Sequence, residues 1–301
     1  MARLTGRAPA GRDGQRARQR DGQSASDQQR LVTHRFGAHA RHWDELYLRD
    51  DLFSVIHRER HDRALRWIER TGLPAGSAVL EVGPGAGVMT VALAERGYDV
   101  AAAETAPEMI GLARARAEAA GVGGRVRLLH ADGTRLPFGD GEFALVVALG
   151  VVPWLHRADL AVAEMARVLR PGGYLAVNAD NRYRLTLVLD PRHHPALDPA
   201  RIAAKSALAA AGIARPGEPR PRVTAHRPAD FDRMLQSGGL EIVRRCTFGF
   251  GPFTMLGLPA VPAHLGVPLS ARLQRLADRQ VPLIRTGGNQ YLVLARRSGL
   301  R

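Results

Sequence analysis

The sequence has few of the residues that crosslinked, metal-caged or membrane-spanning proteins need. It holds one cysteine, Cys246, so neither an internal disulfide framework nor a cysteine zinc cage can form. No apolar run reaches the roughly 18 residues of a membrane span, and no apolar core follows the N-terminal arginines as in a signal peptide. These absences predict a cytoplasmic protein without a transmembrane segment.

Lysine is also nearly absent, since Lys205 is the only lysine among 43 basic side chains. The net charge of +14 divides into +6 over residues 1–42, −4 over 43–181 and +12 over 182–301. Basic flanks of this kind are typical of proteins with an anionic partner. A bias toward arginine codons explains the excess equally simply, and we favour it. A nucleic-acid partner is therefore not expected, although the charge alone leaves it open.

The composition divides the chain into a basic tail, 1–40, and a single folded domain, 41–301. The tail consists of Arg, Gln, Asp, Gly and Ser with hardly an apolar side chain. Such a segment cannot bury enough surface to offset the entropy of ordering, so we expect it to be disordered and its removal to leave stability unchanged. From Trp43 onward, apolar residues recur near helical spacing and predict N-terminal cap helices over 41–74.

Two histidines on these helices have the spacing of a metal site. His57 and His61 lie one helical turn apart, but the run HRERH does not match HExxH. We interpret them as part of a solvated helix face, and no metal site is predicted.

Five short apolar strands then alternate with amphipathic stretches over 78–181. The strands are expected at 78–82, 100–103, 126–130, 143–149 and 174–178. Thr105 and Glu108 have the spacing of a capping box, which predicts a helix from Thr105 to about Gly121. This alternation predicts an α/β fold, a Rossmann-like doubly wound sheet that binds its ligand at the carboxyl ends of the strands. Two irregular stretches, 182–224 and 249–288, are predicted to be helical cap insertions over a substrate, with a helix and two strands in the remainder.

The strongest motif is the glycine-rich turn Gly83-Pro84-Gly85-Ala86-Gly87 after the first strand. Glycines let the backbone turn sharply and let a ligand approach closely. A nicotinamide-binding turn would read GxGxxG, whereas valine stands at position 88 here and Glu81 precedes the turn. An acidic strand end opposes a phosphate and suits a ligand that carries positive charge.

This turn resembles the first motif of the class I S-adenosylmethionine-dependent methyltransferases, specifically their small-molecule, methyltransferase type 11-like branch. Further motifs of that family follow in order, in HADGTRLPF, ALVVALGVVPWLH and ARVLRPGGYLAV. The resemblance covers about residues 43–181 and implies a mostly parallel sheet with an antiparallel last strand. It implies that Glu104 holds the ribose hydroxyls of S-adenosyl-L-methionine and that Asp132 lies near the adenine amino group. The implied cofactor-binding residues are Glu81, Gly83, Pro84, Gly85, Gly87, Glu104, Thr105, Met109, Asp132, Gly133 and Leu149.

The residues leave the methyl acceptor open. The polar motif used for nucleobase and glutamine amino groups is missing, since the nearest run reads Val151-Val152-Pro153-Trp154. Tyr47 and Trp154 are candidates for the substrate pocket through cation–π contact with a sulfonium. Possible bases near the strand ends are His156, Asp180, Tyr183, His193, His194 and His226, among which we select His156 and Tyr183 as catalytic candidates.

Three functions are compatible with these motifs. The favoured hypothesis is transfer of a methyl group to O, N or C of a small molecule in secondary or cofactor metabolism. The alternatives are an RNA or protein methyltransferase that uses the basic flanks, and a noncatalytic protein that only binds the cofactor.

Overall fold

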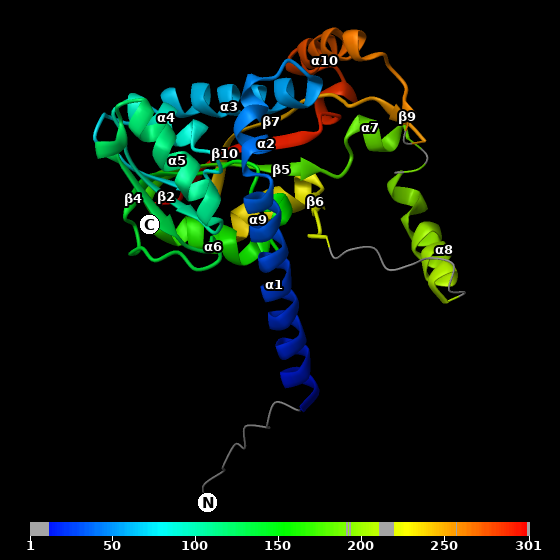
Figure 1. Ribbon diagram of the computed structural model, residues 1–301, viewed down its shortest axis with the longest axis horizontal. Coiled ribbons are helices and arrows are strands. Elements are labelled where there is room, and N and C mark those ends of the chain that lie inside the picture. The colour runs from blue at the N-terminus through cyan, green and yellow to red at the C-terminus, as the bar shows by residue number, and fades with distance from the viewer. Residues whose placement is uncertain (1–11, 191, 193, 211–219, 257, 300–301) are drawn as a thin grey trace, which may run out of the picture.

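The computed structural model describes residues 12–190, 192, 194–210, 220–256 and 258–299 (Figure 1). Its centre is a sheet in the order β3-β2-β1-β4-β5-β10-β7, with β6 paired to β5. The strands of this sheet are β1 Ala78–Val82, β2 Asp99–Glu104, β3 Val126–His130, β4 Phe143–Ala148, β5 Leu169–Asn181, β6 Ala225–His226, β7 Leu240–Phe248 and β10 Gln290–Arg297. A separate short hairpin joins β8 Thr254–Met255 to β9 Leu258–Pro259.

The strand directions confirm the predicted fold class. Strands β1 to β6 pair in parallel, whereas β10 runs antiparallel to both β5 and β7. The change of strand order lies between β1 and β4, because β2 and β3 extend to one side of β1 and the later strands to the other. In open α/β sheets this crevice is where ligands bind.

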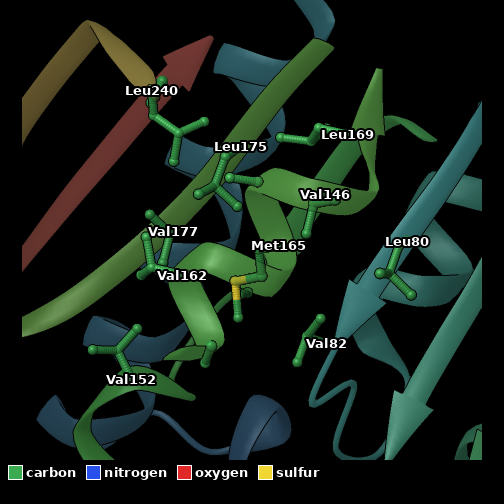
Figure 2. Close-up of a cluster of buried hydrophobic side chains, with 14 of the residues drawn as sticks. Leu80, Val82, Val146, Val152, Val162, Met165, Leu169, Leu175, Val177 and Leu240 are labelled. Atoms are coloured by element: carbon green, nitrogen blue, oxygen red, sulfur yellow. The ribbon is translucent and has the colours of Figure 1, made fainter. Parts of the chain in front are cut away.

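Helices cover both faces of the sheet and leave its central strands buried. On one face, α6 (Ala158–Val168) and α9 (Pro228–Ser237) pack on Leu80 and Val82, and Figure 2 shows Met165 and Val162 among them. On the other face, α3 (Leu52–Glu69) and α4 (Val88–Glu95) pack on Val79. Every side chain of β4 is buried, as expected for a strand covered on both sides.

The remaining helices lie around this core. They are α1 Arg12–Ala38, α2 Ala40–Glu45, α5 Pro107–Ala119, α7 Leu185–Val188, α8 Asp198–Ala210 and α10 Ala263–Asp278. Short 3-10 helices lie at Leu46–Leu48, Gly123–Arg125, Val152–Trp154, Pro195–Leu197 and Ile284–Thr286. Within the described residues, none of the helices has the length and apolarity that crossing a membrane requires.

The prediction of a disordered tail is wrong for residues 12–38, which form α1 (Figure 1). The C-terminal half of this helix docks on the domain, because Gln28 and Val32 are buried. The Gln28 amide donates to the carbonyls of Trp154 (3.0 Å) and Arg222 (2.8 Å) and accepts from the Arg222 N–H (2.9 Å). Composition missed this contact because the anchoring side chain is polar. Residues 1–11 of the predicted tail lie outside the described residues.

One local prediction is also corrected. Helix α5 begins at Pro107, with Ala106 rather than Thr105 as its N-cap, so there is no capping box. The Thr105 hydroxyl is engaged instead by α1, where Gln29 Nε2 and Thr33 Oγ1 lie 3.0 and 3.1 Å away. The stretch 249–288, predicted to be a helical insertion, does contain a helix, the 16-residue α10, which has Pro268 in its interior.

Candidate active site

A cavity of about 270 Å³ opens at the carboxyl ends of the parallel strands. One wall consists of the turns that follow β1, β2, β3 and β4, and it includes the glycine-rich turn. The opposite wall consists of side chains from α1, α2 and α3, and Asp180 and Gln290 complete it. The cavity therefore lies where the topology of the sheet predicts a ligand.

The glycine-rich turn needs glycine for two different reasons. Gly85 has a φ of +54°, and nothing lies within 4 Å of the position that its Cβ would take, so this turn leaves open space on the cavity side. Gly87 has a φ of +81° and does not line the cavity. A Cβ on Gly87 would lie 2.8 Å from the Cα of Ala113, so this glycine allows α4 and α5 to pack closely.

Glu104 and Asp132 hold fixed positions on the strand-end wall. Glu104 Oε1 accepts from the N–H groups of Thr105 (2.7 Å) and Ala106 (3.1 Å), and its Oε2 accepts from Gly85 N–H (3.3 Å). Asp132 Oδ1 accepts from both the N–H and the hydroxyl of Thr134, each at 2.8 Å. Both carboxylates are thus oriented by short-range hydrogen bonds and line the cavity.

Glu81 lies deeper, at the base of the same wall, and is buried. Burial raises the pKa of its carboxyl to about 7, against a hydrogen bond from the Thr90 hydroxyl that lowers it, and the nearby Glu104 raises it further. A cation entering the cavity would favour the ionised form of this carboxyl.

The opposite wall carries polar groups on one face of α3. His57, Arg60 and His61 line the cavity, so the prediction of a solvated face for the two histidines is wrong. The sequence signal was their spacing, which places positions 57, 60 and 61 on one side of a helix. The sequence does not show that this side of the helix faces the strand ends, because that depends on how α3 packs in the tertiary structure. Within the described residues, no group of three or more His, Cys, Asp or Glu side chains could hold a metal ion.

His57 is neutral in this environment. Burial lowers its pKa to about 3, and the charge of Arg60 lowers it as well. Its Nδ1 lies 2.8 Å from the carbonyl oxygen of Phe53, which can only accept, so Nδ1 carries the proton. The Nε2 atom is consequently a hydrogen-bond acceptor.

Aromatic side chains surround these polar groups. The ring of Phe36 lies 5.2 Å from those of both Trp43 and Trp154, and Phe53 lies 4.2 Å from His57. Trp43, Phe36, Phe53, Tyr47 and Trp154 all line the cavity. This half of the cavity suits an apolar, flat molecule.

The structure brings most of the predicted site residues together. Every predicted cofactor residue except Gly87 lines the cavity, as do Tyr47 and Trp154 of the predicted substrate pocket. Asp180, one of the possible bases, also lines it, and burial raises its pKa against the charges of Arg184 and Arg60.

The two catalytic candidates do not line the cavity. Tyr183 is exposed, with the Arg227 guanidinium 5.4 Å above its ring, because it follows the end of β5 and faces outward. His156 lies beyond the 3-10 helix that carries Trp154 and is likewise outside the cavity lining. Proximity to a strand end does not fix the direction of a side chain, so the sequence could not show that these two residues lie outside the cavity lining. His194 and His226 do not line the cavity either, and His193 lies outside the described residues.

The predicted cap insertions also need correction. In the parts of 182–224 and 249–288 that the structure describes, no residue lines the cavity, so its cap comes from α1, α2 and α3. The end of the first insertion supports this cap indirectly. Thr224 N–H donates to the carbonyl of Pro153 (2.7 Å), and Arg222 binds Gln28 of α1.

Comparison with known proteins identifies the segment that carries the strand-end wall. Residues 80–177 match the family described as "Methyltransferase domain". This segment is a methyltransferase domain. The resemblance inferred from the sequence motifs is thereby confirmed.

Several curated proteins are similar to the methyltransferase domain. A demethylmenaquinone methyltransferase of Thermus thermophilus is 42% identical over 108 residues, which are 34% of this chain and 47% of that protein. A demethylmenaquinone methyltransferase of Parafrankia is 34% identical over 151 residues, which are 45% of this chain and 59% of that protein. The chain thus spans about half the length of the curated relatives it matches.

The fold itself extends over more of the chain. The crystal structure of magnesium protoporphyrin IX methyltransferase from Synechocystis, with bound SAH, aligns with a TM-score of 0.60 at 17% identity. The alignment covers 90% of this chain and all of that chain, at 100%. At this identity the likeness establishes the fold.

Proposed function

We propose that this protein is a S-adenosyl-L-methionine-dependent methyltransferase that acts on a small molecule. The observation that carries the proposal is the single cavity between two unlike walls. One wall presents the glycine-rich turn with Glu104 and Asp132, and the other presents aromatic rings with His57 and Arg60. A cofactor and an acceptor bound on these walls would meet inside one enclosed space.

The residues of the strand-end wall fit the cofactor. Glu104 is held by backbone N–H groups in front of the turn, where it can accept from two ribose hydroxyls. The hydrogen bonds of Asp132 engage only Oδ1, so Oδ2 is available to an adenine amino group. The open space at Gly85 admits a ligand against the backbone, and the buried Glu81 provides negative charge for a cationic one.

The bound cofactor supplies an activated methyl group on a sulfonium. The protein then has to place a nucleophile in line with that methyl and to exclude water. The rings of Trp43, Phe36 and Trp154 form an apolar enclosure for this purpose, and α1 closes it where Gln29 binds Thr105. Asp180, whose pKa is raised by burial, is a cavity-lining group able to accept a proton from an acceptor hydroxyl, whereas His57 Nε2 can accept a hydrogen bond from it.

The names of the relatives support a small-molecule acceptor in cofactor or secondary metabolism, because they include demethylmenaquinone methyltransferases and the methyltransferase GfsG of Streptomyces halstedii. A cytoplasmic location and the absence of a nucleic-acid partner stay predictions from the sequence.

The proposal is tested by calorimetry with S-adenosylmethionine and S-adenosylhomocysteine in the presence of a chelator. Binding of both ligands is expected. Glu104→Gln is expected to weaken the binding about 30-fold, because two charge-assisted hydrogen bonds become neutral ones and each change loses about 1 kcal/mol of binding free energy. Glu118→Gln is the matched control, since Glu118 is exposed at the end of α5. Absence of binding at millimolar ligand, or equal affinity of the two variants, contradicts the proposal.

A further inference from the structure

The wall of the cavity that α1, α2 and α3 form, which we call the acceptor wall, holds a cation that has no hydrogen-bond or ion-pair partner among the described residues. Arg60 lies on α3, lines the cavity and is 8% exposed. Among the residues that the structure describes, none forms a hydrogen bond with its side chain or an ion pair within 4.0 Å of it. A buried guanidinium with five N–H donors and no acceptor is costly, which points to a ligand that supplies the acceptor.

Arg60 lies close to the strand-end wall of the cavity. A Cβ built on Gly150, two residues after the end of β4, would lie 2.8 Å from Arg60 Nη1 and 3.2 Å from its Cζ. The Gly150 N–H donates to Asn178 Oδ1 (2.7 Å), which fixes the backbone beneath the guanidinium. Arg60 is therefore held between the strand ends and the aromatic rings of the cap.

The other polar groups around Arg60 make no hydrogen bond or ion pair with it. The charge of Arg60 acts on the nearby Asp180, which shares the cavity, but the ion pair of Asp180 is with Arg184, at 3.8 Å. His57 is neutral with its Nδ1 proton donated to Phe53. His61 Nε2 is buried and has no hydrogen-bond partner, but His61 Nδ1 lies 3.3 Å from the accepting Asp62 Oδ1, so Nε2 is an acceptor for a donor group of a ligand and does not compete with Arg60 for an anionic oxygen.

We propose that the methyl acceptor is an apolar, ring-bearing molecule with an anionic oxygen, a carboxylate or an acidic phenol, which Arg60 binds. The aromatic rings of Phe36, Trp43 and Trp154 contact the ring of the acceptor, while Arg60 contacts its oxygen. This inference rests on the proposed function and adds the chemical class of the acceptor.

The proposal is tested with matched probes that differ in charge. The acids benzoate, naphthoate and para-nitrophenol are compared with benzamide, naphthamide and para-nitroanisole. Binding is measured at saturating S-adenosylhomocysteine by calorimetry, and for para-nitrophenol also by the colour of its phenolate. The bound phenol is expected to ionise at lower pH than the free phenol, because Arg60 stabilises the phenolate.

Acids are expected to bind at least about tenfold more tightly than their neutral counterparts, as one charge-assisted hydrogen bond predicts. Arg60→Gln is expected to abolish this preference, and Arg60→Lys, which keeps the charge, to retain part of it. Arg66→Gln is the control, because it removes the same charge from an exposed position of α3. Circular dichroism checks the fold of each variant. If Arg60→Gln unfolds, Arg60→Lys is compared with the wild type, and an unchanged preference for acids in Arg60→Lys contradicts binding by the Arg60 guanidinium.

The outcomes separate the two proposals. If S-adenosylhomocysteine itself does not bind, the proposed function is wrong. If it binds but no acid does, or neutral probes bind equally well, or the preference survives in Arg60→Gln, the acceptor class is wrong.

Discussion

The buried polar side chain of Gln28, on the docked half of helix α1, leads to a quantitative prediction. Gln28 is 8% exposed and makes three hydrogen bonds, two to Arg222 and one to Trp154, between 2.8 and 3.0 Å. The change Gln28→Ala removes all three and leaves two carbonyls and one N–H without their partner. At about 1 kcal/mol for each bond, the docking of α1 is expected to lose about 3 kcal/mol.

Hydrogen exchange measures this loss directly. Amides of residues 28–38 and 222–224 are expected to exchange about 100-fold faster in Gln28→Ala, which corresponds to about 3 kcal/mol. Arg30→Ala is the control, because Arg30 lies on the same helix, is exposed, and only pairs with Asp27 on the surface, an interaction worth about 0–1 kcal/mol. If Gln28→Ala exchanges no faster than Arg30→Ala, Gln28 is not the anchor of α1.

Three further predictions concern the core of the site and the charge of the chain. Gly87→Ala is expected to destabilise the fold by about 1–3 kcal/mol in urea unfolding, because of its positive φ and the contact with Ala113, whereas Gly124→Ala, which meets no atom within 4 Å, is expected to be neutral. Stability without ligand is expected to fall by up to about 3 kcal/mol as pH rises from 4.5 to about 7, because folding raises the pKa of Glu81 across that range and so favours its neutral form. The same titration of Glu81→Gln is expected to lack this slope, and an unchanged slope would show that another group causes it. Binding of bulk RNA in a filter assay is expected to vanish near physiological salt, and tight binding that persists there with methyl transfer would favour the RNA methyltransferase alternative.

The sequence by itself determined the sheet and the wall of the cavity that the strands form. The strands are recognisable as short apolar runs, and motif residues such as Gly85, Glu104 and Asp132 follow their ends. The order of these residues along the chain is therefore enough to place them at the carboxyl edge of the sheet. A parallel α/β sheet aligns the carboxyl ends of its strands by construction. For the strand-end wall, the sequence pattern of each strand therefore also predicts where its motif residues lie in the fold.

Only the tertiary structure decided the other wall. The apolar period of α3 predicts a helix, but its docking direction decides whether His57, Arg60 and His61 face solvent or the strand ends. The composition of α1 predicts disorder, because a scale of hydrophobicity assigns no burial to Gln28, whose hydrogen bonds exist only once Trp154 and Arg222 lie beside it. Polar groups are buried when their partners come from distant parts of the chain, and such partners become visible only after the chain has folded.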